Sequence, residues 1–119
     1  MKIAVTSTGR DPDSGIDNRF GRTAWFVLYD TETGTFEAIE NQQNLTLPQG
    51  AGIQSAALVV NAGCRVLISN HCGPKAFTVL AKGGVKTYLA ADGTVRQCIE
   101  KYKKGFLKEL ADADVEGHW

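Results

Sequence analysis

Residues 67–84 read LISNHCGPKAFTVLAKGG, and the expected architecture of the chain can be built outward from this segment. Residues 66–68 (VLI) form a short apolar run of the kind that fills a buried parallel strand. The run ends in polar residues, after which Pro74 opens a helical pattern; proline at the first helical position loses no hydrogen bond. The segment therefore predicts a strand, a turn and a helix.

The turn between this strand and helix carries the candidate chemistry. A helix that begins at Pro74 directs the amides of residues 75–77 back toward the carboxyl end of the strand. Those N–H groups and the helix dipole favour an anion. His71 and Cys72 lie at the same turn, and imidazole and thiolate are ligands that suit copper. We therefore treat both as candidate metal ligands, with a capping or solvent-exposed histidine as the alternative for His71.

The segment after the central helix predicts one more strand and one more helix. Gly83-Gly84 ends the central helix, and residues 85–89 form the strand. Thr94 is placed to cap the last helix, and Gln97, three residues on, completes a capping box. The predicted buried stripes are Phe77, Leu80 and Ala81 in the central helix and Val95, Ile99, Tyr102 and Phe106 in the last one.

The amino-terminal half predicts three strands and a helix. Residues 2–6, 24–31 and 35–40 are β-rich runs, and Gly34 supplies the positive φ that a tight hairpin between the last two requires. A helix follows the small residues Gly50, Ala51 and Gly52 and stops near Gly63. Its predicted buried face is Ile53, Ala56, Ala57 and Val60.

Residues 7–22 (STGRDPDSGIDNRFGR) form a long loop. Loops beyond about 12 residues in a compact domain are usually functional or disordered. Phe20 beside Gly21 indicates that the loop is pinned back onto the domain, and its arginines, Arg10, Arg19 and Arg22, could contact an anion. A solvated loop without a role is the alternative.

This order of elements predicts an α/β fold: a mixed five-stranded sheet with helices on its faces. The strands near residues 2, 65 and 85 should be parallel, and the one after residue 23 antiparallel. Open α/β sheets bind ligands at the carboxyl ends of their parallel strands. Three loops should converge there, namely residues 7–22, 49–52 and 70–75.

Composition restricts the class of protein. With 119 residues and 43% hydrophobic content, the chain suits a single domain spanning residues 1–119. Thirteen basic and thirteen acidic residues cancel, which argues against a nucleic-acid or membrane partner. We expect no signal peptide or membrane helix, and the three widely spaced cysteines fit a reducing cytoplasm. Cys64 and Cys98 are expected to be small buried hydrophobes.

Several segments together resemble the dinitrogenase iron–molybdenum cofactor-binding family. They are MKIAV at the start, FGR ahead of an aromatic strand, GAGIQSA, GPKAFTVLAKGG, GTV before the last helix, and VEGHW at the end. The resemblance covers essentially the whole chain and implies a ribonuclease-H-like α/β fold. Family members include carriers and insertases of nitrogenase cofactor. One branch, the orange protein of sulfate-reducing bacteria, is similar in size and holds a molybdenum–copper sulfide cluster.

The resemblance places a cofactor near glycine-rich loops at one end of the sheet, here residues 50–52 and 70–77. Many stand-alone members have glycine or an aliphatic residue where this chain has His71 and Cys72, so these two depart from the pattern. The full candidate cofactor-binding set is Arg10, Phe20, Gly21, Arg22, Gly50, Ala51, Gly52, Asn70, His71, Cys72, Gly73, Pro74 and Lys75, with Cys72 and His71 as the candidate metal ligands.

The sequence thus predicts a protein, not an enzyme, that binds or carries an anionic metal–sulfide cluster of molybdenum–copper or iron–molybdenum type. Its partners would be proteins that deliver or receive the cluster. A nuclease would need clustered carboxylates, but residues 2–6 carry none and Asp30 stands alone on its strand. A thiol enzyme using Cys72 is weakened because adjacent residues point in different directions. A cofactor-free interaction module remains the main rival.

Overall fold

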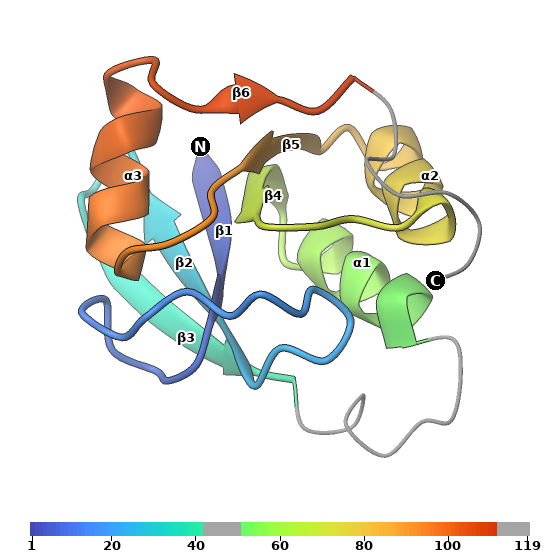
Figure 1. Ribbon diagram of the computed structural model, residues 1–119, viewed down its shortest axis with the longest axis horizontal. Coiled ribbons are helices and arrows are strands. Elements are labelled where there is room, and N and C mark those ends of the chain that lie inside the picture. The colour runs from blue at the N-terminus through green and yellow to red at the C-terminus, as the bar shows by residue number, and fades with distance from the viewer. Residues whose placement is uncertain (42–50, 112–119) are drawn as a thin grey trace.

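The computed structural model describes residues 1–41 and 51–111, in which the strands form one mixed six-stranded sheet (Figure 1). Its strand order is β3-β2-β1-β4-β5-β6. The elements along the chain are β1 (Lys2–Ser7), β2 (Trp25–Asp30), β3 (Phe36–Glu40), α1 (Ala51–Asn61), β4 (Cys64–Ser69), α2 (Pro74–Lys82), β5 (Lys86–Leu89), α3 (Val95–Lys103) and β6 (Lys108–Glu109).

The pairing of the strands confirms the predicted α/β class and corrects the strand count. β1, β4 and β5 are parallel, and β2 and β3 extend the sheet antiparallel from β1. A sixth strand, β6, pairs antiparallel with β5 through Tyr88↔Glu109 and Leu89↔Lys108. Five strands were predicted because β6 is only two residues long, too short to show an alternating pattern.

Helices cover both faces of the sheet, with α1 and α2 on one and α3 on the other (Figure 1). Successive residues of β1 point to opposite faces, as in any strand. Ala4 belongs to the apolar cluster under α1 and α2, while Ile3 and Val5 belong to the one under α3. The sheet is therefore buried on both sides, which explains the nearly continuous apolar character of β1 and β4. None of the helices described is long and apolar enough to cross a membrane.

The helical faces differ in part from the predicted ones. In α1 the buried residues are Ala51, Ser55, Ala56 and Val59. Ile53, predicted as buried, is 38% exposed. The buried face is rotated because α1 contacts α2 as well as the sheet, and small residues on that side let the two helices approach.

The predicted stripes of α2 and α3 also need correction. In α2, Ala76 and Leu80 are buried, whereas Ala81 is exposed and Phe77 is only partly buried. In α3, Val95 and Ile99 are buried and Tyr102 packs partly against them, as predicted. Phe106 is 73% exposed. The helix ends at Lys103 and Gly105 has a φ of 76°, so helical spacing does not extend to Phe106.

Candidate functional site

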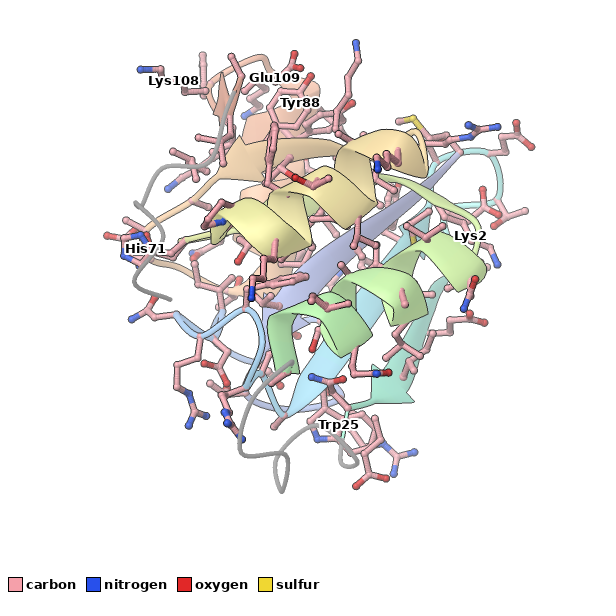
Figure 2. The ribbon with its side chains drawn as sticks, turned by 90° about the vertical axis from the view of Figure 1, so that its right-hand side faces the viewer. Lys2, Trp25, His71, Tyr88, Lys108 and Glu109 are labelled. Carbon is pink, nitrogen blue, oxygen red and sulfur yellow. The ribbon has the colours of Figure 1, made fainter. Side chains whose placement is uncertain are left out.

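The turn that follows β4 lies at the carboxyl edge of the parallel strands. Figure 2 shows His71 on the opposite side of the molecule from Lys2, the residue that begins β1. Helices α1 and α2 both run antiparallel to the parallel strands, so both begin at this edge. The edge thus brings together the start of α1, the start of α2 and residues 70–73.

The first turn of α2 presents backbone donors as predicted, with one correction. The cap residue is Gly73, which has no side-chain cap, and Pro74 is at the first helical position. The amide of Phe77 donates to the carbonyl of Gly73 at 2.9 Å, so it is engaged within the helix. Helix geometry leaves the amides of Lys75 and Ala76 without an acceptor inside the helix.

The first turns of α1 and α2 are in contact. A Cβ added at Gly52 would lie 3.5 Å from Cβ of Ala76, which is an ordinary van der Waals distance. Ala51 is buried and Gly52 half-buried at the start of α1, while Gly50 lies outside the described residues. In Figure 2 the two helices lie side by side in front of the sheet. Two positive helix-dipole ends therefore meet at one place on the surface.

The start of α3 differs, because its donors are already used. Thr94 and Gln97 form the predicted capping box. The amide of Val95 donates to the carbonyl of Ser14 at 3.0 Å, and that of Arg96 to the carbonyl of Pro12 at 2.8 Å. The start of α3 is thus closed by its own cap and by the long loop, which leaves α1 and α2 as the candidate anion-binding helices.

The loop of residues 8–22, hereafter the strap, crosses the carboxyl edge of the sheet from α3 to α1 (Figure 1). The amide of Ile16 donates to the carbonyl of Gly93 at 3.0 Å, beside α3. At the other end Phe20 is buried, as predicted, with its ring 5.8 Å from that of Phe26. The strap is therefore fixed to both sides of the sheet.

Gly21 brings the strap onto the backbone of α1. A Cβ at this position would lie 2.9 Å from the amide nitrogen of Gly52 and 3.1 Å from its Cα. The carbonyl of Gly21 accepts a hydrogen bond from Oγ of Ser55 at 3.1 Å. Only a residue without a side chain lets the strap pass this close to the first turn of α1.

A buried polar network that was not predicted from the sequence supports this contact. The Asn41 side chain donates from Nδ2 to the carbonyl of Thr23 and to Oγ of Ser55, both at 3.0 Å. Oγ of Thr23 in turn accepts from the amide of Ser7 at 3.1 Å. Asn41 and Thr23 are fully buried, although their sequence neighbourhoods are those of polar connections.

The structure separates the two candidate metal ligands. Cys72 is 1% exposed and belongs to the apolar cluster with Ala76 and Leu80. His71 is half-buried at the rim, and its carbonyl accepts from Oγ of Ser69 at 3.4 Å. Within residues 1–41 and 51–111, no group of three or more histidine, cysteine or acidic side chains could hold a metal ion.

The cationic candidates are also distributed unevenly. The guanidinium of Arg10 stacks over the ring of Trp25 at 5.9 Å. Figure 2 shows Trp25 and His71 at separate corners of the molecule, so Arg10 is not brought to the turn. Arg22 is half-buried next to Gly21, and Lys75 is exposed in the first turn of α2.

Two of the surface hollows lined by described residues lie away from the starts of α1 and α2. One is lined by Lys2, Asp30, Phe36 and Glu37 among others, at the amino end of β1. The other adjoins α3 around Asp92 and Arg96. Neither contains a residue predicted for the site.

The remaining cysteines are buried, as predicted. Desolvation by burial raises the pKa of the Cys64 thiol to about 11 and also raises that of Cys98. Both groups are neutral thiols near neutral pH, and thiolate is the form that binds metals. Their positions in the two apolar clusters agree with the prediction that they are small buried hydrophobes.

Comparisons with known proteins agree with this fold. The model of the dinitrogenase iron–molybdenum cofactor family matches residues 1–105, and the chain belongs to that family. Among solved structures, the apo orange protein from Desulfovibrio gigas is 36% identical with a TM-score of 0.92 over 96% of both chains. A NifB-like protein of the DUF35 family from Thermotoga is 35% identical with a TM-score of 0.84 over 98% of both chains.

A curated relative is similar over nearly the whole chain. An uncharacterized protein of Methanocaldococcus jannaschii is 32% identical over 113 residues, which is 92% of both chains. The family and the neighbours point to a role in binding or carrying a metal cluster.

Proposed function

We propose that this protein binds or carries an anionic metal–sulfide cluster at the carboxyl edge of its sheet, in the cytoplasm and without catalysing a reaction. The observation that carries the proposal is the contact between the first turns of α1 and α2, through Gly52 and Ala76, beneath the strap. Each helix start contributes a partial positive charge of about half an elementary charge. Two such starts at one place favour an anion more than one does.

The residues at this edge fit a bulky, soft anion. Backbone amides at helix starts donate hydrogen bonds to an anion whatever the side chains are. Each charge-assisted contact contributes roughly 1.5–3 kcal/mol. The exposed ammonium of Lys75 lies in the first turn of α2, and Pro74 and Phe77 supply apolar surface. Such a site can hold a preformed cluster without a bond from the protein to the metal.

The burial of Cys72 supports non-covalent capture over ligation. The Cys72 side chain is 1% exposed and would have to turn outward to reach a metal at the surface. His71, half-buried at the rim, is the more accessible of the two and acts as a secondary contact. The same burial disfavours a thiol enzyme.

Similarity to the orange protein favours the molybdenum–copper type of cluster, with the iron–molybdenum cofactor as the alternative.

Metal analysis and a visible spectrum of the protein purified from its own cell test the proposal. We expect bound molybdenum, with copper or iron, and a coloured protein. The apo protein, titrated with tetrathiomolybdate and copper(I), should become coloured and gain thermal stability. A colourless native protein that gains nothing from these reagents would contradict the proposal and favour the interaction module.

Variants at the turn then separate capture from ligation. Cys72→Ala and His71→Ala should both keep the coloured complex, because backbone amides hold the cluster. Cys98→Ala, which removes an equally buried thiol under α3, is the matched control. Loss of colour in Cys72→Ala but not in Cys98→Ala would make Cys72 a metal ligand and would refute non-covalent capture.

A further inference from the structure

The strap contains a buried acidic side chain, Asp17, whose charged partner is exposed. The carboxylate of Asp17 is 4% exposed, and its partner is the side chain of Arg19, which is 65% exposed. Oδ1 of Asp17 accepts from Nε of Arg19 at 3.1 Å, and Oδ2 accepts from Nη2 at 3.0 Å. Oδ1 also accepts from the amide of Arg19 at 3.0 Å. A buried carboxylate thus holds an exposed guanidinium through the Nε–Nη2 side of the group.

The backbone fixes Asp17 itself. Its amide donates to the carbonyl of Thr6 at 3.1 Å, and its carbonyl accepts from Oγ1 of Thr6 at 2.8 Å. Thr6 is fully buried in β1, the central strand of the sheet. Asp17 is therefore fixed by two hydrogen bonds to a fully buried strand, and its carboxylate in turn fixes the guanidinium of Arg19.

Contacts on either side of Arg19 place it at the proposed site. Oδ1 of Asn18 accepts from Nδ2 of Asn70 at 3.2 Å, and Asn70 adjoins His71. Two residues after Arg19, Gly21 packs against the backbone of Gly52. Arg19 thus lies in the strap between its contact with the turn after β4 and its contact with the start of α1.

We propose that Asp17 is a positioning residue that presents the guanidinium of Arg19 to the anionic cluster. The inference rests on the proposed function and deepens it. A guanidinium has five N–H donors in a rigid plane, and Asp17 engages two of them. The other three remain available to an anion, because the Arg19 side chain is 65% exposed. Pre-ordering a long side chain removes an entropic cost that binding would otherwise carry.

Orientation and simple charge make opposite predictions for Asp17→Asn. The substitution removes a negative charge beside the site, so charge alone predicts tighter binding of a dianion. Loss of the bidentate contact frees the guanidinium, so positioning predicts weaker binding. The sign of the change in affinity therefore tests the proposal directly.

A second ion pair, which joins the strap to α3, provides a matched control. Nε of Arg96 donates to Oδ1 of Asp13 at 2.9 Å, beside α3, and both side chains are exposed. Asp13→Asn removes one negative charge, as Asp17→Asn does at the site. Arg96→Lys keeps the positive charge but replaces the guanidinium, as Arg19→Lys does. Asp13 and Arg96 lie near the closed start of α3, away from the starts of α1 and α2.

The experiment measures the dissociation constant of tetrathiomolybdate for each variant by calorimetry at one fixed salt concentration. Asp17→Asn and Arg19→Lys should each weaken binding roughly tenfold, and the double variant should be no weaker than either single one. Asp13→Asn and Arg96→Lys should leave affinity within about twofold of the parent. Circular dichroism and melting temperature confirm folding, and Arg19→Lys keeps the test valid if Asp17→Asn fails to fold.

Three results would overturn the inference. Unchanged or tighter binding by Asp17→Asn would show that orientation does not matter. Equal losses at Arg19 and Arg96 would show a general charge effect. A fall in melting temperature without a change in affinity, for both variants at the site, would show that the pair is purely structural. If the parent protein binds no tetrathiomolybdate, the proposed function fails first and the inference fails with it.

Discussion

Thr87 shows how a single buried atom can limit stability. Its side chain lies in β5 under α2, and its Oγ1 is buried without a hydrogen-bond partner in the part of the chain that the structure describes. A buried hydroxyl without a partner costs roughly 1–3 kcal/mol. Thr6 has the same side chain, equally buried, but its Oγ1 donates to the carbonyl of Asp17 at 2.8 Å. The two threonines therefore differ in whether the buried hydroxyl has a hydrogen-bond partner.

We predict that Thr87→Val raises the free energy of unfolding by about 1 kcal/mol, because it removes the unpaired hydroxyl and keeps the shape. Thr6→Val should lower it by a similar amount, since it leaves the carbonyl of Asp17 without that donor. Urea unfolding followed by circular dichroism measures both. Equal effects of the two substitutions would show that the hydrogen-bonding state of the hydroxyl is not the cause.

At the residue scale, the sequence predicted apolar positions better than polar ones. Cys64 and Cys98 were predicted to be buried and are. Asp17 and Asn41 are buried as well, yet both lie in segments rich in polar residues, a composition typical of solvated loops. Their burial depends on partners 11 to 18 residues away, such as Thr6 and Thr23, and local composition carries no record of such partners.

At the element scale, the ends of the helices were predicted better than their buried faces. Helix α2 spans Pro74–Lys82 and α3 carries the capping box at Thr94, because proline, glycine and capping residues act locally. The face of α1 was wrong because it depends on how α1 lies between the sheet and α2. The tight contact between Gly21 and α1 was also not predicted. The sequence indicated that Gly21 helps to pin the loop, but not which element it contacts.

Gly21 and Gly52 form a pair of glycines with opposite expected responses. Gly21→Ala should lower the free energy of unfolding by about 1–3 kcal/mol, because the new Cβ would meet backbone atoms of α1 that cannot move aside. Gly52→Ala should be neutral or stabilising by up to about 1 kcal/mol, because it adds a better helix former where the nearest atom is 3.5 Å away. Thermal unfolding of both variants distinguishes these outcomes. Destabilisation by Gly52→Ala would contradict the assigned contact.

At the scale of the whole molecule, the alternation of strands and helices was enough to predict the mixed sheet and its parallel strands. The right-handed crossover rule and short connections leave few other arrangements. The proposed position of the site rests on a separate rule, that open α/β sheets bind ligands at the carboxyl ends of their parallel strands. The two-residue β6 and the attachment of the strap to α3 could not be predicted, because both are long-range pairings of short segments.

The pH dependence of stability is also a property of the whole fold. Burial raises the pKa of Cys64 from an ordinary value of 9.0 to about 11. Between these values the unfolded chain loses the thiol proton while the folded chain keeps it, so the free energy of unfolding falls as pH rises. The contribution of Cys64 is complete below pH 9 and its loss above pH 11 amounts to at most about 3 kcal/mol.

We predict that Cys64→Ala shows a shallower fall in stability between pH 9 and pH 11 than the parent protein does. Urea unfolding at a series of pH values measures both slopes. Cys98, Tyr88 and Tyr102 also have raised pKa values and remain in the variant, so some fall should persist. Parallel curves for the two proteins would contradict the assignment to Cys64.

The central place of β1 in the sheet has a consequence for how the chain is made on the ribosome. Among the strands of this sheet β1 emerges first, and its antiparallel neighbour β2 follows with 17 residues between the two strands. Its parallel neighbour β4 begins only at Cys64, so one edge of β1 stays unpaired while the intervening chain is synthesised. An open apolar edge is a template for pairing with other chains. The nascent chain that contains only β1, β2 and β3 is therefore the form most exposed to pairing with other chains, and chaperones would protect it there.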